Sequence, residues 1–106
     1  MPKYLWKASY TTRGVRGVAE EGGSGRRDAV QRATESVGGT LEAFYFAFGE
    51  DDAYVVADLP DNETAAAVAL AVNGSEGAVV QTVVLMTPEE LDAASKKNVD
   101  FRSAGG

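Results

Sequence analysis

Four segments of the chain have the pattern of β-strands: side chains alternate with a period of two in the first, and the three later segments are mainly apolar. The clearest of these segments, "TLEAFYFAF", is followed by the turn "GEDD" and by a returning apolar segment, which predicts a β-hairpin. The acidic residues of that turn are expected to be solvated rather than to hold a cation. The four expected strands are residues 4–10, 40–48, 53–59 and 77–86.

Apolar residues recur at helical spacing between the first two strands. A helix capped by Thr11 or Thr12 is expected to run to about Glu21, where "GGSG" interrupts it, and to resume after Ser24. A pair of glycines at 38–39 ends the second piece, as is common at helix C-termini. The pattern therefore predicts a helix that is broken near its middle.

Two further helices are expected later in the chain. "ETAAAVALAV", at residues 63–72, consists almost entirely of small residues and has Asp61 as its expected cap. Residues 87–90, "TPEE", form a capping box that opens a short C-terminal helix, and residues 99–106 follow it as an irregular tail. The order of elements predicts an α+β, ferredoxin-like βαββαβ fold, with an antiparallel four-stranded sheet plus a C-terminal helix, as a single domain over residues 1–106.

The expected strands are apolar on both faces. In the strongest strand, Leu41, Ala43 and Tyr45 are expected on one face and Phe44 and Phe46 on the other. Since the helices of a ferredoxin-like fold cover only one face of the sheet, another layer must cover the second face. We therefore expect a homodimer or a higher homo-oligomer that packs sheet against sheet. The alternative is that the C-terminal helix and tail fold back as a lid, although this segment carries few apolar residues.

Composition and charge exclude several kinds of chemistry. The chain of 106 residues contains neither cysteine nor histidine, so disulfides, histidine-based catalytic triads and three-histidine zinc sites cannot form within it, and we expect no metal and no cofactor. The net charge of −6 disfavours nucleic acid as a partner, and no apolar segment approaches the length of a membrane span. Because the amino-terminal segment "MPKYLWKASY" also lacks the apolar stretch of a signal peptide, the expected location is the cytoplasm.

Three long segments of the chain resemble the GYD-domain proteins, which are small bacterial proteins of uncharacterised function. They are "KASYTTRGVRGVAEEGGSGRRDAV", "ESVGGTLEAFYFAFGEDDAYVVADLPDN" and "AAAVALAVNGSEGAVVQTVVLMTPEEL". The resemblance implies a dimeric α+β barrel, in agreement with the sheet-on-sheet packing expected from the strands. The family signature is glycine, any residue, tyrosine and aspartate; Gly49 and Asp52 match it here, whereas Asp51 stands in the place of the tyrosine.

The segment "EEGGSGRR", at residues 20–27, joins the two pieces of the first helix. The twenty residues from 13 to 32 carry a net charge of +2 within an otherwise acidic chain. Ser24, Arg26 and Arg27, together with backbone N–H groups at the start of a helix, are candidates for binding a carboxylate or phosphate. The alternative is a hinge in which one of the two glutamates pairs with one of the two arginines across the break.

Aromatic residues gather on strands that are expected to be neighbours, and the cleft between sheet and helices is the expected ligand site. Trp6, Tyr10 and Tyr45 are its candidate aromatic residues, with Arg26 fixing an anionic substituent and Asp52 as a further candidate. The expected function is that of a homodimeric small-molecule binding protein, and a cofactor-independent enzymatic role on an apolar or aromatic substrate stays open. The alternative is a noncatalytic homo-oligomeric module in which these residues serve only packing.

Overall fold

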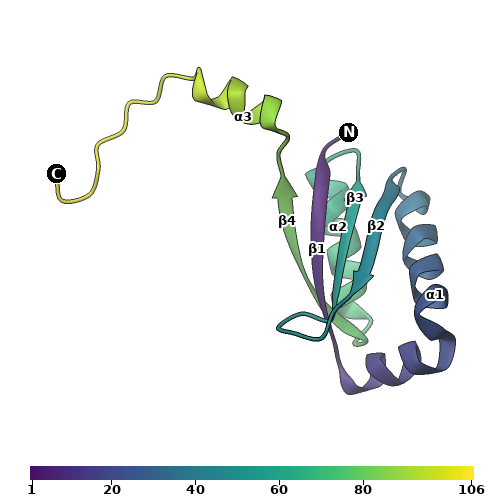
Figure 1. The fold of residues 1–106 in the computed structure, drawn as a ribbon. Coiled ribbons are helices and arrows are strands. Elements are labelled where there is room, and N and C mark those ends of the chain that lie inside the picture. The colour runs from purple at the N-terminus through teal and green to yellow at the C-terminus, as the bar shows by residue number, and fades with distance from the viewer.

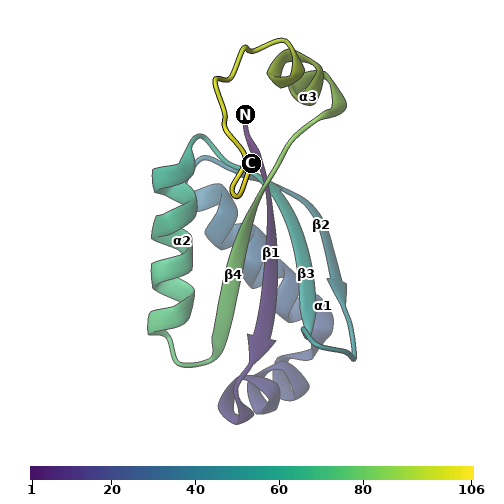
Figure 2. The same ribbon diagram turned by 90° about the vertical axis from the view of Figure 1, so that its left-hand side faces the viewer.

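The computed structural model describes residues 1–106 and contains a four-stranded antiparallel sheet with two helices on one face and a third helix beyond it (Figure 1; Figure 2). The strands lie in the order β2-β3-β1-β4, and every neighbouring pair is antiparallel. This arrangement confirms the predicted ferredoxin-like α+β fold. The elements are β1 (Lys3–Tyr10), α1 (Thr12–Ser36), β2 (Thr40–Phe46), β3 (Ala53–Asp58), α2 (Asn62–Gly74), β4 (Ala78–Leu85) and α3 (Pro88–Ser95).

The two covering helices lie over the edges of the sheet rather than over its middle. α1 packs mainly on β2, and α2 packs on β4, and these are the two edge strands. Figure 1 shows the two helices standing apart from each other. The buried core lies on the helix-facing side of the central strands β1 and β3 and consists of Tyr4, Trp6, Val55, Ala57, Leu59 and Ala65.

Helix α1 is bent sharply at Gly22. Its N-cap is Thr11, whose hydroxyl accepts a hydrogen bond from the backbone N–H of Gly14 at 3.1 Å. Gly22 has a φ of 83° and a ψ of 161°, a backbone conformation that residues with a Cβ rarely adopt. The predicted interruption of this helix is therefore confirmed, and it is confined to the first glycine of "GGSG". Gly23, Ser24 and Gly25 already belong to the second half of the helix.

A β-bulge in β2 changes which side chains share a face of the sheet. The register between β2 and β3 pairs Leu41 with Ala57 and then Ala43 with Val56, so one residue of β2 has no partner. Leu41 consequently packs against the core together with Phe44, whereas Tyr45 lies on the opposite face. The expectation that Leu41 and Tyr45 share a face is wrong, because a simple period of two does not continue through a bulge.

The face of the sheet that bears no helix carries exposed apolar side chains. Tyr45 is 71% exposed, and on β4 Val79 and Val83 are 58% and 39% exposed. Charged residues occupy one end of the same face, where the Lys3 ammonium group pairs with Glu42 and, at 3.0 Å, with Asp58. We call this surface the open face.

The connection between β2 and β3 is held tightly against β1. Asp51 is only 8% exposed; its carboxylate lies 3.5 Å from the Lys7 ammonium group and accepts a hydrogen bond from the Ser9 hydroxyl at 3.3 Å. Asp52 accepts a hydrogen bond from the backbone N–H of Tyr10 at 2.8 Å. The expectation of a solvated turn is therefore wrong for Asp51, because contacts with a strand more than 40 residues earlier in the chain bury it.

The remaining helices begin as predicted, but the C-terminal segment does not cover the sheet. Asp61 caps α2 by accepting a hydrogen bond from the backbone N–H of Thr64 at 2.8 Å, and Thr87 and Glu90 form the capping box of α3. In Figure 1, α3 and the tail extend away from the sheet, and every residue from 86 to 106 is exposed. The structure therefore does not show the lid that we considered as an alternative to a dimer.

Candidate functional site

A cleft of about 320 Å³ lies between the sheet and the two covering helices. Its floor is formed by the central strands and its walls by α1 and α2, and 14 of its 19 lining residues are hydrophobic. Alanines occur on every side of it, so the side chains are too short to meet in the middle. These small residues are Ala8, Ala53 and Ala78 on the sheet, Ala29 and Ala33 on α1, and Ala71 on α2.

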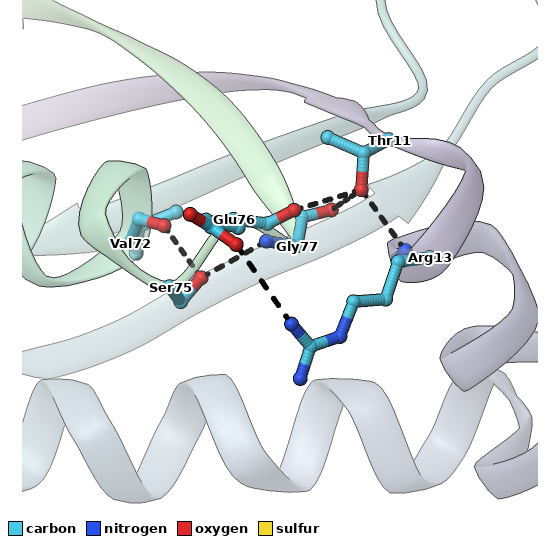
Figure 3. A network of polar contacts seen from close by, with 7 residues as sticks. Thr11, Arg13, Val72, Ser75, Glu76 and Gly77 are labelled. Carbon is cyan, nitrogen blue, oxygen red and sulfur yellow. Dashed lines mark hydrogen bonds and ion pairs between the residues drawn. The ribbon is translucent and has the colours of Figure 1, made fainter.

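One end of the cleft is closed where the start of α1 meets the turn between α2 and β4. Figure 3 shows the Thr11 hydroxyl donating hydrogen bonds to the carbonyl oxygens of Glu76 at 2.9 Å and Gly77 at 3.2 Å. The Arg13 guanidinium group lies 4.0 Å from the Glu76 carboxylate, and both side chains are about four-fifths exposed, so this pair adds little stability. Gly14 approaches Gly77 so closely that a Cβ on Gly14 would lie 1.8 Å from the Gly77 carbonyl oxygen. The absence of a side chain at Gly14 is therefore what allows the two segments to meet.

Few polar side chains line this cleft, and two of them are already satisfied by the backbone. The Thr34 hydroxyl donates to the carbonyl oxygen of Val30 at 2.8 Å, and the Ser75 hydroxyl donates to that of Val72 at 2.6 Å. Such groups offer little to a ligand, because their donor capacity is used within their own helices.

The other polar groups at the cleft wall come from Trp6, Tyr10 and Arg26. The indole Nε1 of Trp6 and the Nε of Arg26 are buried and have no hydrogen-bond partner. Arg26 Nε does lie 3.2 Å from Glu21 Oε1, so the two side chains form an ion pair whose geometry is not that of a hydrogen bond. A buried donor without a partner costs about 1–3 kcal/mol.

Tyr10 lies at the end of β1, beside the break in α1. Burial raises the pKa of its phenol, because the charged phenolate is poorly solvated there. The Arg26 charge lowers this pKa, whereas the charges of Asp52 and Glu21 raise it, and the net effect is an increase. The Tyr10 hydroxyl is therefore protonated at neutral pH and can donate a hydrogen bond.

The pairing that spans the break in α1 is the hinge alternative considered from the sequence. Glu21 pairs with Arg26 as described above, and Arg27 lies 3.6 Å from its neighbour Asp28. Ser24 and Arg27 line a separate shallow depression of about 280 Å³ outside the cleft. The structure thus separates Arg26 from the two residues with which it was expected to form an anion site.

Of the seven candidate residues, the structure brings Trp6, Tyr10 and Arg26 together at the cleft. Tyr45 lies on the open face, so the expectation that it lines the same cleft is wrong, and the bulge in β2 explains why. Asp52 connects the hairpin to β1, since its backbone N–H also donates to the Ala8 carbonyl at 2.8 Å.

Sequence reasoning missed the residues that create the space itself. Neither Phe44 nor the alanines of the cleft were among the candidate site residues, yet the short alanine side chains define the volume. The available signal was the run of small residues at 63–72, which becomes α2. A helix of this composition cannot fill the space in front of a sheet as a leucine-rich helix would.

Comparison with known proteins assigns the chain to a family. Residues 4–95 match the family described as GYD domain, and the chain belongs to that family. No curated protein and no solved structure matches the chain. None of its helices combines the length and apolar character needed to cross a membrane, and no three acidic side chains lie together as ligands for a metal ion.

Proposed function

We propose that this GYD-domain protein is a homodimeric small-molecule binding protein whose ligand, apolar or aromatic in its main part, occupies the cleft between the sheet and helices α1 and α2. The observation that carries the proposal is the cleft itself: about 320 Å³ of space with mainly hydrophobic walls and the Tyr10 hydroxyl among its few polar groups. Ligand sites usually combine an apolar pocket with a few polar groups in this way, although this volume is at the lower end of their usual range.

A reaction without a cofactor is a natural extension of this proposal. Tyr10 is the group in the cleft that can donate a proton, since its phenol is protonated at neutral pH and burial raises its pKa further. The chain contains no histidine to act as a base, so Tyr10 is the residue to replace first in any search for activity.

The homodimer is supported by the open face. Its exposed tyrosine and valines lie on the side of the sheet without helices, and the C-terminal segment extends elsewhere. Packing two such faces together would remove this apolar surface from water at a gain of about 25 cal/mol per Å². The cleft opens on the other side of the sheet, so dimerisation through the open face leaves it accessible.

The dimer is tested by two matched substitutions on β4. Val79 and Val84 are 58% and 57% exposed but lie on opposite faces of the strand. We expect Val79→Lys to shift sedimentation from a dimer to a monomer, because it buries a charge in the interface, whereas Val84→Lys should leave the dimer intact. If the unmodified protein sediments as a monomer, the dimer proposal is wrong.

Ligand binding is tested by native mass spectrometry of freshly purified protein and by titration with tetralin, a compact apolar probe. The single tryptophan lines the cleft, so its indole N–H signal in NMR spectra reports on occupancy. Ala71→Leu, which narrows the cleft, should weaken tetralin binding roughly tenfold. Ala66→Leu, an exposed position on the same helix outside the cleft, should not.

The result also separates this proposal from a purely structural module. A dimer that carries no co-purified mass and gives no saturable change of the Trp6 signal would contradict ligand binding. It would support the noncatalytic alternative, in which the aromatic residues serve only packing.

A further inference from the structure

The polar groups that the cleft offers to a ligand are mainly hydrogen-bond donors. Trp6 Nε1 and the Arg26 guanidinium group can only donate, and Tyr10 provides a hydroxyl that both donates and accepts. The remaining hydroxyls at the wall, those of Thr34 and Ser75, already donate to backbone carbonyls. A ligand with an acceptor oxygen therefore matches this wall better than one with only donors.

The charges around these donors disfavour an ionised ligand. Arg26 is paired with Glu21 at 3.2 Å, and the carboxylates of both Glu21 and Asp52 act on the Tyr10 hydroxyl and raise its pKa. The Tyr10 hydroxyl therefore has one positively charged neighbour, Arg26, and two negatively charged neighbours, Glu21 and Asp52. An anionic ligand would have to displace Glu21 from Arg26 or lie near two like charges, and both cost free energy.

A cationic ligand is disfavoured for a different reason. The Glu21 carboxylate is engaged by Arg26, and the Asp52 carboxylate accepts the backbone N–H of Tyr10 at 2.8 Å. The buried wall itself presents N–H groups, which cannot accept a hydrogen bond from an ammonium group.

We propose that the ligand of the cleft is a neutral molecule with a compact apolar ring system and a carbonyl oxygen, and that this oxygen accepts a hydrogen bond from the Tyr10 hydroxyl. This inference rests on the proposed small-molecule binding function. It replaces the anionic substituent expected from the arginines of "EEGGSGRR", because the structure shows the nearest of them, Arg26, paired with Glu21.

The test uses three probes with one ring skeleton: α-tetralone, tetralin and tetralin-1-carboxylate. Each is titrated into the full-length protein, and binding is followed in N–H correlation NMR spectra. We expect α-tetralone to bind roughly three- to tenfold more tightly than tetralin, which corresponds to one neutral hydrogen bond. Tetralin-1-carboxylate should bind more weakly than α-tetralone at neutral pH. The Trp6 indole N–H signal should shift with each probe that binds in the cleft, because Trp6 lines it.

Two tyrosine variants form the matched control. Tyr10→Phe removes a hydroxyl at the cleft, and we expect it to abolish most of the difference between α-tetralone and tetralin. Tyr45→Phe removes a hydroxyl on the open face and should change neither affinity. A difference that persists in Tyr10→Phe would overturn the assignment of Tyr10 as the donor.

The outcomes separate this inference from the function on which it rests. If all three probes bind in the cleft but α-tetralone gains nothing over tetralin, or the carboxylate binds most tightly, the ligand class is wrong and the binding function stands. If no probe gives a saturable shift and no ligand co-purifies, the proposed function fails, and this inference fails with it.

Discussion

Replacing Gly14 with alanine should destabilise the protein, although the same change stabilises most helices. A Cβ at this position would lie 1.8 Å from the carbonyl oxygen of Gly77 and 2.9 Å from its carbonyl carbon. Non-bonded carbon and oxygen atoms approach to only about 3.3 Å. The start of α1 and the turn before β4 must therefore move apart by more than about 1 Å.

The size of the effect follows from the contacts that this movement breaks. The backbone N–H and the hydroxyl of Thr11 both donate to Gly77 O, at 3.1 and 3.2 Å. Losing both costs about 2 kcal/mol, and crowding adds about 1–3 kcal/mol. The better helix propensity of alanine offsets about 1 kcal/mol. The net expectation is a loss of about 2–4 kcal/mol, or a Tm lower by more than about 10 °C in a domain of this size.

Gly17→Ala is the control, since Gly17 lies one turn further along the same helix and a Cβ there would meet no atom within 4 Å. It should stabilise the protein by up to about 1 kcal/mol. Urea and thermal unfolding of both variants can be followed by the fluorescence of Trp6, the single tryptophan. If Gly14→Ala proves as stable as Gly17→Ala, the close approach of α1 to this turn is wrong, and with it the closed end of the cleft.

Three further predictions concern local stability. Glu76 has a φ of 64°, a backbone conformation that is strained for a residue with a side chain. Glu76→Gly should relieve this strain and raise the free energy of unfolding, measured by urea titration, by up to about 1 kcal/mol. A lower free energy of unfolding would show that Glu76 is not strained. Hydrogen bonds from the hydroxyl and backbone N–H of Thr64 lower the pKa of Asp61, so its stabilising effect should be present above its unfolded pKa and lost as the pH falls through the lowered value. Asp61→Asn keeps the cap, but its free energy of unfolding should fall less in acid than that of the unmodified protein. If the free energies of unfolding of the two proteins depend identically on pH, this prediction is wrong. Tyr4→Phe removes a hydrogen bond to Asn62 from a residue that is 1% exposed, and should lower the free energy of unfolding by about 1 kcal/mol in the same titrations. An unchanged free energy of unfolding would show that this hydrogen bond does not stabilise the protein.

The elements of the fold were predictable because the signals for them are local. The four strands, the cap at Asp61 and the capping box at Thr87 each depend on residues that are close together in the sequence, and the structure confirms all of them. The break in the first helix was also predictable, since a glycine-rich interruption between two helical patterns has few other interpretations. Sequence order then restricted the topology to the ferredoxin-like arrangement.

The candidate site was predictable only in part, because its residues depend on pairing between distant segments. Trp6 and Tyr10 come from the regular strand β1, so a period of two assigned both to the correct face. Tyr45 follows a bulge that becomes visible only when β2 is paired with β3. Asp51 was expected in water, and contacts with Lys7 and Ser9 bury it.

The sequence by itself determined the elements, their order and the small size of the side chains on α2, since propensity, capping and periodicity act over short distances. Only the tertiary structure decided where the space left by those small side chains would lie. α1 and α2 rest on the two edge strands, and the central strands between them keep a cleft beside Trp6, Tyr10 and Arg26. The pairing of Arg26 with Glu21 also depends on the three-dimensional structure, because the conformation of one glycine, Gly22, sets how the two halves of α1 meet.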